Sequence, residues 1–130
     1  MKYISTHAIK IVLGIIIAVT LFHLGIIIKL IPYQITWGGR LKNDTEMYIF
    51  ESVSILINLF LSLVLCMKGN YISYKLSDKL ITLVLWLFII LFALNTLGNL
   101  FAKTILEKTF ALLTLILSFL LWQIVRDKNK

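Results

Sequence analysis

Two carboxylates and a histidine lie inside or at the edge of long apolar stretches of this sequence, where ionisable side chains are costly. They are Glu51, Glu107 and His23. Ionisable groups within a membrane are rare, face the protein interior and pair with one another. A carboxylate near an imidazole could bind a polar headgroup or relay protons, because histidine changes charge near neutral pH. The sequence therefore predicts a polar site in an otherwise apolar protein.

Amides, cations and a tryptophan extend this candidate site. The segment Asn95-Thr96-Leu97-Gly98-Asn99 puts two amides and a glycine together, which favours contact with something specific. Amides in membrane helices otherwise hydrogen-bond to neighbouring helices. The full candidate ligand-binding set is His23, Trp37, Arg40, Glu51, Asn58, Asn95, Asn99, Lys103 and Glu107.

Motifs for familiar catalytic and metal chemistry are absent from the sequence. It contains no H-E-x-x-H, no P-loop, no G-x-S-x-G and no CxxC. His7 and His23 fall on opposite sides of the predicted membrane, so they cannot share a metal. Cys66 is the single cysteine, which excludes an internal disulfide. We therefore predict no catalytic residue, no metal site and no cofactor.

The composition indicates a protein that is embedded in a lipid bilayer. Of 130 residues, 60% are hydrophobic and only 15% are charged, whereas soluble domains are roughly 45–50% apolar and about 25% charged. A single small domain cannot hide so much apolar surface from water. The net charge of +7 does not indicate nucleic acid binding, because the basic residues lie scattered between apolar runs.

Four apolar stretches position the candidate residues. A helix needs about 20 apolar residues to cross a bilayer, and we expect helices at about 9–31, 44–67, 78–102 and 105–125. The first is expected to be retained, because its apolar run is longer than that of a signal peptide and no cleavage site follows it. Short connections favour antiparallel packing. The predicted fold is all-α: one domain, residues 1–130, forming an up-down-up-down transmembrane four-helix bundle.

Helical spacing of 100° per residue gathers the polar side chains of three helices into stripes. The residues of the stripes, in chain order, are Glu51, Ser54, Asn58 and Ser62; Asn95, Thr96, Asn99 and Lys103; and Glu107, Thr114 and Ser118. On the 9–31 helix, Gly14, Ala18 and Gly25 form a small-residue stripe of the kind that lets helices approach closely. His23 lies on the other side of that helix.

The connection from Tyr33 to Glu46 is the most distinctive local sequence. Gly38-Gly39 predicts a tight turn with positive φ, and the flanking residues 35–37 and 40–42 could form a small hairpin. Asn43 and Glu46 resemble a capping box. Two interpretations stay open for this loop: a structured turn with an interfacial tryptophan, or a lid over the outer mouth of the bundle.

Lys and Arg counts predict the orientation. With both termini inside, the inner segments hold eight basic residues and the outer segments five: Lys29, Arg40, Lys42, Lys103 and Lys108. This favours cytoplasmic termini. Richness in Ile, Leu, Lys and Asn suggests a bacterial source, and hence the inner membrane. Most of the candidate site then lies in the outer half, whereas Leu80–Leu94 offers only Thr82 and Trp86 as polar residues.

Two interpretations of the polar cluster remain open. In the structural one, Asn, Ser and Thr join helices at about 0.6 kcal/mol per hydrogen bond, while Glu51 pairs with Arg40 or Lys103 and Glu107 with Lys103. In the functional one, the cluster forms an outward-facing polar pocket with apolar walls.

Two short resemblances accompany these features. The segments 37–44 and 95–99 are similar to those of small, uncharacterised bacterial four-helix membrane proteins. Gly25-x-x-x-Lys29-Leu30 resembles DoxX-like proteins, which are also small four-helix membrane proteins. This second resemblance covers six residues and implies the same architecture.

Three functions are compatible with the sequence. The first is binding of a lipid headgroup, a small solute or a partner membrane protein at the polar pocket. The second is an oligomeric small transporter or channel. The third is a membrane enzyme using Glu51, His23 or Glu107 as acid or base, which the missing motifs disfavour. Expected partners are membrane lipids, a second membrane protein or further copies of the chain, and not nucleic acid.

Overall fold

The structure, a computed structural model, describes residues 2–127, with side chains from residue 5 onward. Within that part the regular elements are all helical: α1 (Lys2–Ile27), α2 (Asp44–Lys68), α3 (Asp78–Leu100) and α4 (Ile105–Arg126), with two short 3-10 turns between α1 and α2. The predicted all-α, four-helix fold is confirmed. Each helix is long and apolar enough to cross a membrane, so the chain is a multi-pass membrane protein.

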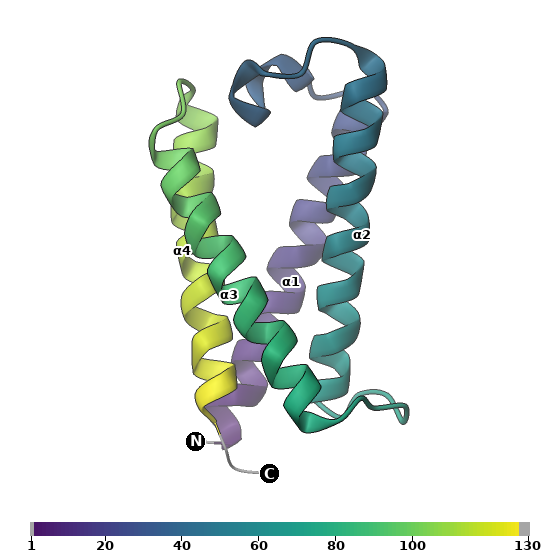
Figure 1. Ribbon diagram of the computed structural model, residues 1–130, viewed down its shortest axis with the longest axis vertical. Helices are drawn as coiled ribbons and strands as arrows, with labels where there is room; N and C mark the ends of the chain where they lie inside the picture. Colours follow the sequence, from purple (N-terminus) through teal and green to yellow (C-terminus); the bar gives the residue numbers. More distant parts are fainter. Residues whose placement is uncertain (1, 128–130) are drawn as a thin grey trace.

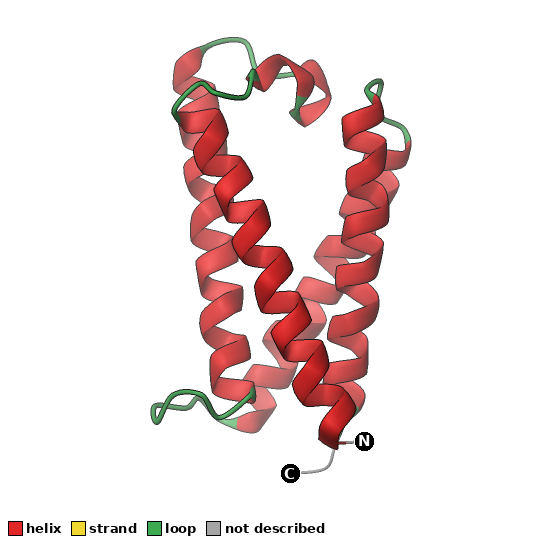
Figure 2. Cartoon of the chain, turned by 180° about the vertical axis from the view of Figure 1, so that it is seen from behind, coloured by secondary structure: helices red, strands yellow, loops and turns green. Residues whose placement is uncertain are grey.

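The chain passes back and forth along one long axis (Figure 1). The connections 28–43 and 101–104 lie together at what we term the loop end. The connection 69–77 and both ends of the described chain lie at the opposite, terminal end. Viewed from behind, α1 with α2 and α3 with α4 form two pairs that separate toward the loop end (Figure 2).

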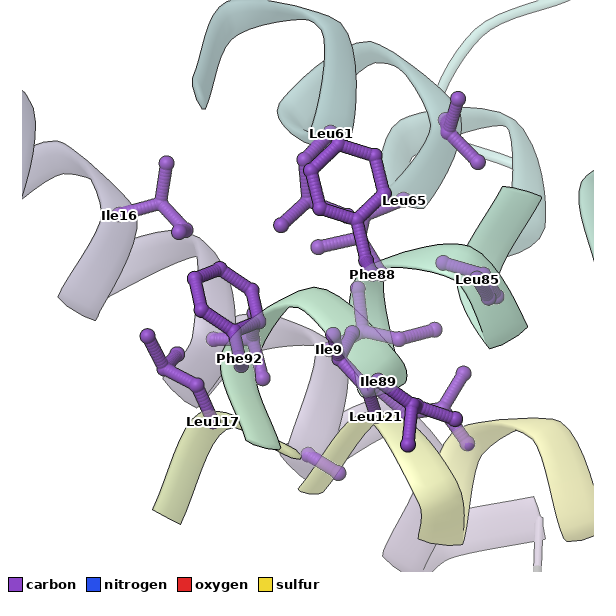
Figure 3. Packing of buried hydrophobic residues seen from close by; sticks show 14 of the residues in the cluster. Ile9, Ile16, Leu61, Leu65, Leu85, Phe88, Ile89, Phe92, Leu117 and Leu121 are labelled. Atoms are coloured by element: carbon purple, nitrogen blue, oxygen red, sulfur yellow. The ribbon is translucent and has the colours of Figure 1, made fainter. Parts of the chain in front are cut away.

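At the terminal end all four helices share one apolar core (Figure 3). It comprises the N-terminal half of α1, the C-terminal half of α2, the N-terminal half of α3 and the C-terminal half of α4. We call this the terminal core; its buried residues are Ala8, Ile9, Val12, Ile16, Leu61, Val64, Leu65, Met67, Ile81, Leu85, Phe88, Ile89, Phe92, Leu117, Leu121 and Ile124. In lipid such a core is held by van der Waals packing rather than by exclusion of water.

At the loop end the apolar packing is smaller and one-sided. Its buried residues are Ile26, Leu41 and Met47, which belong to α1, the following connection and α2. The α4 helix reaches this region through Phe110, whose ring centroid lies 5.0 Å from that of Phe22. The terminal core therefore does not extend to the loop end, and other contacts must join the two helix pairs there.

The first helix ends earlier than expected. The predicted range 9–31 is wrong at its C-terminus, because α1 stops at Ile27 and Lys29 adopts a left-handed conformation with φ of 62°. The backbone N–H groups of Leu30 and Ile31 both donate to the carbonyl of Gly25, at 2.9 and 3.1 Å. This tight cap satisfies a carbonyl that the helix leaves open and turns the chain before Pro32.

The predicted cap of α2 is confirmed. Asn43 Oδ1 accepts from the backbone N–H of Glu46 at 2.9 Å. The Glu46 carboxylate in turn accepts from the N–H of Lys42 at 2.8 Å, one residue before the cap. Reciprocal bonding of this kind fixes where the helix begins.

The predicted close-packing stripe on α1 is wrong. Gly14 and Ala18 are exposed, and a Cβ added at Gly14 would meet no atom of another residue within 4 Å. The buried face of this helix instead carries Val12 and Ile16. Gly14 and Ala18 therefore lie away from the bundle, whereas Gly25 is half-buried and lies against the side chain of Ile31.

Candidate functional site

A strap of irregular chain crosses the loop end between the two helix pairs (Figure 1). We use "strap" for residues 33–43, which contain the two 3-10 turns, Tyr33–Ile35 and Trp37–Gly39. The expected hairpin is therefore wrong. The expected positive φ at the glycines is confirmed, and Trp37 shares it: φ is 53°, 66° and 69° at residues 37, 38 and 39. For tryptophan this conformation costs about 1–2 kcal/mol, so contacts elsewhere must hold it.

Glu51 of α2 provides the first of these contacts. Its side chain is fully buried, two turns into the helix that Asn43 caps. One carboxylate oxygen contacts His23 Nδ1 of α1. The other accepts from the indole N–H of Trp37. Both oxygens are occupied, and pairing of Glu51 with Arg40 or Lys103, as predicted, is wrong.

Aromatic rings surround this carboxylate. The ring of Trp37 lies edge-on to that of Phe50, with centroids 5.1 Å apart. The His23 ring lies edge-on to Phe22 at 6.1 Å. The side chain of His23 is 16% exposed, so the imidazole has some contact with the surroundings while the carboxylate behind it has none.

Glu107 of α4 provides the second contact. It is 5% exposed and accepts the backbone N–H of Gly38 on one oxygen. The hydroxyl of Thr104 donates to its other oxygen at 2.8 Å. Thr104 is also the N-cap of α4 and accepts from the N–H of Glu107 at 3.2 Å. The predicted pairing with Lys103 is therefore wrong.

The position of Glu107 explains how it can be buried without an ion pair. It lies in the first turn of α4, where the helix dipole stabilises negative charge. Hydrogen bonds from Gly38 and Thr104 complete its surroundings. The hydroxyl of Thr104 also lies 3.4 Å from the carbonyl oxygen of Ile35, which seats the strap on α4.

Adjacent strap residues are thus tied to different helix pairs. Trp37 bonds to α2 and Gly38 to α4. Every buried side-chain nitrogen and oxygen in the described part of the chain has a partner. Around Glu51 and Glu107 the polar cluster is therefore fully paired, as the structural interpretation expects.

Other polar residues join helices within each pair. Asn58 is buried and donates to Thr20 of α1 across 3.4 Å, linking α1 to α2. Thr96 and Thr114 share a 2.8 Å hydrogen bond between α3 and α4, and Ser118 donates to the carbonyl of Ile89 at 3.0 Å. The α4 stripe faces the interior, as its spacing predicts.

Asn95 and Asn99 lie apart from these contacts. Residues 81, 85, 88 and 92 of α3 form a buried seam with spacings of four and three, and 95 and 99 continue it toward the loop end. Asn95 is exposed and Asn99 is half-buried. Neither side chain makes a hydrogen bond to any residue that the structure describes. We call this part of α3 the open seam.

The open seam begins where α2 and α3 part. Their rings meet at Phe60 and Phe88, with centroids 6.2 Å apart. Closer to the loop end, α2 contributes no residue before Leu61 to the terminal core. The two amides therefore face the part of the bundle in which the helix pairs separate.

Unpaired charge at the loop end is positive. Arg40, Lys42, Lys103 and Lys108 are exposed, and their side chains form no ion pair with the described residues. The acids at this end are engaged: Glu46, Glu51 and Glu107 as described above, and Asp44 with Lys29 at 2.6 Å. The Asp44 hydrogen bond and charge raise the pKa of the Lys29 ammonium.

Arg40 and Lys103 lie near the same junction. A Cβ added at Gly38 would lie 3.5 Å from Nε of Arg40, so this side chain folds back over the turn that Glu107 holds. Lys103 precedes the cap residue Thr104. Trp37, by contrast, is 39% exposed with its N–H turned inward to Glu51.

An open pocket of about 260 Å³ lies beside this region, between the end of α1 and the start of α2. Lys29, Tyr33 and Asp44 help to line it, and neither Glu51 nor Asn99 does. In the described residues no three His, Cys, Asp or Glu side chains gather closely enough to hold a metal ion.

Two participants in the site were missed from the sequence. The backbone N–H of Gly38 carries no side-chain signal. Thr104, however, stands three residues before Glu107, which is the spacing of a capping box, and that pattern could have found it. Comparison with known proteins adds no assignment: no family model matches the chain, and neither a curated protein nor a solved structure matches it.

Proposed function

We propose that this chain binds the headgroup of an anionic phospholipid at its loop end, in the inner membrane of a bacterium with both termini in the cytoplasm. The observation that carries the proposal is the open seam, whose two unpaired amides lie at the same end of the protein as four exposed cations. The site then comprises Asn95, Asn99, Lys103 and Arg40, while His23, Trp37, Glu51 and Glu107 hold the strap above it.

Charge selects the class of ligand. Since the acids of the loop end are occupied within the protein, the four exposed cations leave a net positive surface there. Ammonium and guanidinium groups form strong charge-assisted hydrogen bonds with phosphate oxygens. Clusters of Lys and Arg next to membrane spans attract anionic lipids by the same electrostatics.

The expected depth of Asn95 and Asn99 in the membrane favours a lipid over a dissolved anion as the ligand. Asn99 and Asn95 lie within the last two turns of α3, next to exposed Leu94 and Leu97. Amide N–H groups at this level suit phosphate and ester oxygens, while the leucines suit acyl chains. A dissolved anion would use the cations and leave the apolar part of the seam unfilled.

The alternatives have less support. A channel or transporter needs a polar path through the membrane, whereas the terminal core fills half of the bundle with apolar side chains, and the buried hydroxyl of Ser118 there donates to the Ile89 carbonyl. An enzyme needs a free acid or base, and both carboxylates have their two oxygens bonded. The DoxX-like resemblance remains a prediction about architecture and lends this ligand no support.

Native mass spectrometry of the detergent-solubilised protein, titrated with phosphatidylglycerol or phosphatidylcholine, tests the proposal. We expect preference for phosphatidylglycerol. The Arg40→Ala/Lys103→Ala variant should bind it at least about a hundredfold more weakly, because each of the two lost hydrogen bonds to a charged group contributes roughly 1.5–3 kcal/mol and 1.4 kcal/mol is a factor of ten. Asn95→Leu/Asn99→Leu should weaken the binding of both lipids, because the phosphate and ester oxygens that the amides would bind are common to them.

Lys79→Ala is the matched control, since Lys79 is an exposed cation on the same helix at the terminal end. Its binding should equal that of the unchanged protein. Equal affinity for both lipids, or an equal loss in Lys79→Ala, would refute the proposal. If glycerol phosphate alone displaced the lipid, the site would be one for a soluble anion instead.

A further inference from the structure

We infer that the strap is a proton-sensitive latch, which holds the two helix pairs together at the loop end and loosens when Glu51 and Glu107 are protonated. The latch is a property of the strap alone. Its effect on lipid exchange rests on the function proposed above.

The first observation is how few contacts close this end. The small apolar cluster of the loop end belongs to α1, the strap and α2. Toward α4 the structure describes the ring contact of Phe22 with Phe110 and the bonds of the strap to Glu107 and Thr104. Without these bonds of the strap, the ring contact of Phe22 with Phe110 would remain between α1 and α4 at this end.

The second observation is that the strap is held away from its preferred conformation. Three consecutive residues, 37 to 39, are left-handed, and the first is tryptophan. Residues in such conformations persist only where their surroundings over-determine them. Here the surroundings are two carboxylates, so the conformation depends on their protonation state.

Counting protons at Glu51 gives the direction of the effect. The carboxylate offers two acceptor oxygens to two N–H donors, those of His23 and Trp37. When Glu51 gains a proton while His23 is charged, one of its two oxygens becomes a hydroxyl, which carries a proton of its own and is a weaker acceptor. The contact of that oxygen with its N–H donor therefore weakens.

Protonation of Glu107 acts in the same direction. Its bond to the Gly38 N–H is assisted by the negative charge, and charge-assisted hydrogen bonds are roughly twice as strong as neutral ones. Neutral Glu107 also loses its interaction with the dipole of α4. The hydrogen bond between the Gly38 N–H and Glu107 therefore weakens under the same conditions as the contacts of Glu51.

The charged groups around the two carboxylates come from every neighbouring element. His23 of α1 contacts Glu51 directly, and no charged side chain of the described residues contacts Glu107. The remaining charged groups of the loop end all lie at its surface or half-buried: Lys29, Arg40, Lys42, Asp44, Glu46, Lys103 and Lys108. None of these charged groups donates a side-chain hydrogen bond to Glu51 or Glu107.

Trp37 itself is the reporter for the experiment. In the Trp86→Phe/Trp122→Phe protein it is the single tryptophan, and its indole N–H bonds to Glu51. The protein is placed in phosphatidylcholine nanodiscs and taken from about pH 7.5 to about pH 3.5, a range that includes the usual pKa values of imidazole and glutamate carboxyl groups. We expect a red shift of Trp37 emission and greater acrylamide quenching at the lower pH, with unchanged helix content by circular dichroism.

Two variants identify the groups responsible. Glu51→Gln/Glu107→Gln cannot gain the protons, so its Trp37 signal should lose the pH dependence. Asp44→Asn, which neutralises an exposed acid at the same end, should keep it. An unchanged Trp37 signal between the two pH values would overturn the inference, and so would a pH response that survives in the double Gln variant.

Amide exchange in the unchanged chain provides a second measurement that needs no substitution. Acid slows intrinsic base-catalysed exchange, so a fall in the protection factor of the Gly38 N–H at lower pH reports loss of its bond to Glu107. Constant or rising protection would contradict the latch even if the variants failed to fold.

The lipid readout separates the two proposals. If the latch responds in phosphatidylcholine but phosphatidylglycerol never binds, the proposed function fails and the latch stands. If phosphatidylglycerol binds equally fast at both pH values while the Trp37 signal stays unchanged, the latch fails alone. Acceleration of phosphatidylglycerol exchange at the lower pH, lost in the double Gln variant, supports both.

Discussion

The two ends of this bundle are closed by different means. At the terminal end sixteen buried apolar side chains from all four helices interdigitate. At the loop end two buried carboxylates hold two neighbouring residues of an irregular strap. In lipid, apolar packing is made of many weak contacts, whereas a buried carboxylate concentrates its contribution in a few bonds. The difference predicts that single substitutions act gradually at one end and abruptly at the other.

The largest expected effect is that of Glu51→Leu. The substitution leaves the N–H groups of His23 and Trp37 without acceptors, and breaking a buried pair costs about 3–5 kcal/mol. The free energy of unfolding, measured by titration with sodium dodecyl sulfate in mixed micelles, should fall by this amount. Glu51→Gln keeps an acceptor for the indole and is the control, with a smaller loss expected. Equal losses in the two variants would show that shape rather than bonding matters here.

Next comes Leu121→Ala in the terminal core. Leu121 is fully buried, and such substitutions cost roughly 2–5 kcal/mol in soluble proteins. We expect about 2 kcal/mol in the same titration, because lipid-solvated helices gain no exclusion of water on packing. Trp37 fluorescence should stay unchanged in this variant. A loss greater than that of Glu51→Leu would reverse the contrast between the two ends.

Gly38→Ala should have an intermediate effect. Gly38 has φ of 66°, where an L side chain costs about 1–2 kcal/mol, and a Cβ there would also approach Nε of Arg40 at 3.5 Å. Gly14→Ala is the matched control, since that glycine is helical and its added Cβ would meet nothing. It should be neutral or slightly stabilising. Both melting temperatures can be compared in one detergent.

The smallest effect concerns the exposed pair of Lys29 and Asp44. The pKa of Lys29 is raised in the folded state by Asp44. Its contribution to stability is therefore present below the unfolded pKa, about 10.5, and is lost as the pH rises through the higher folded value. Lys29→Met should melt slightly below the unchanged protein near pH 8. At a pH above the raised pKa of Lys29 the two should converge, and a persistent difference would assign the effect to packing.

The helices could be predicted from the sequence because lipid imposes a length and a composition on each of them. The cap at Asn43 and the interior face of Thr114 and Ser118 followed from local spacing alone. The partners of the carboxylates did not. Arg40 and Lys103 carry the opposite charge, but they keep their heads at the surface, and the carboxylates are satisfied by His23, Trp37 and a backbone N–H instead.

The position of Asn95 and Asn99 shows a second limit of sequence patterns. Periodicity grouped them with Thr96 and Lys103 in one stripe, of which Thr96 is buried, Asn99 is half-buried, and Asn95 and Lys103 are exposed. Whether the open seam is covered depends on the angle between two helix pairs, which no spacing within one helix encodes. Likewise, Gly14 and Ala18 have the composition of a contact surface, but the α1 helix turns them away from its neighbours.

Because Trp37 and Gly38 are neighbours bonded to different helix pairs, the strap is sensitive to a change in the tilt of one helix pair relative to the other. The two residues share one peptide bond and are anchored on α2 and α4, while the helix pairs are fixed to each other at the far end. The α3 helix, with 23 residues, is about 35 Å long, so a pivot of about 5° at the terminal core displaces its loop end by roughly 3 Å. Hydrogen bonds do not survive such a stretch. Since membrane helices change tilt with bilayer thickness, the strap couples the loop end of the protein to the thickness of its membrane.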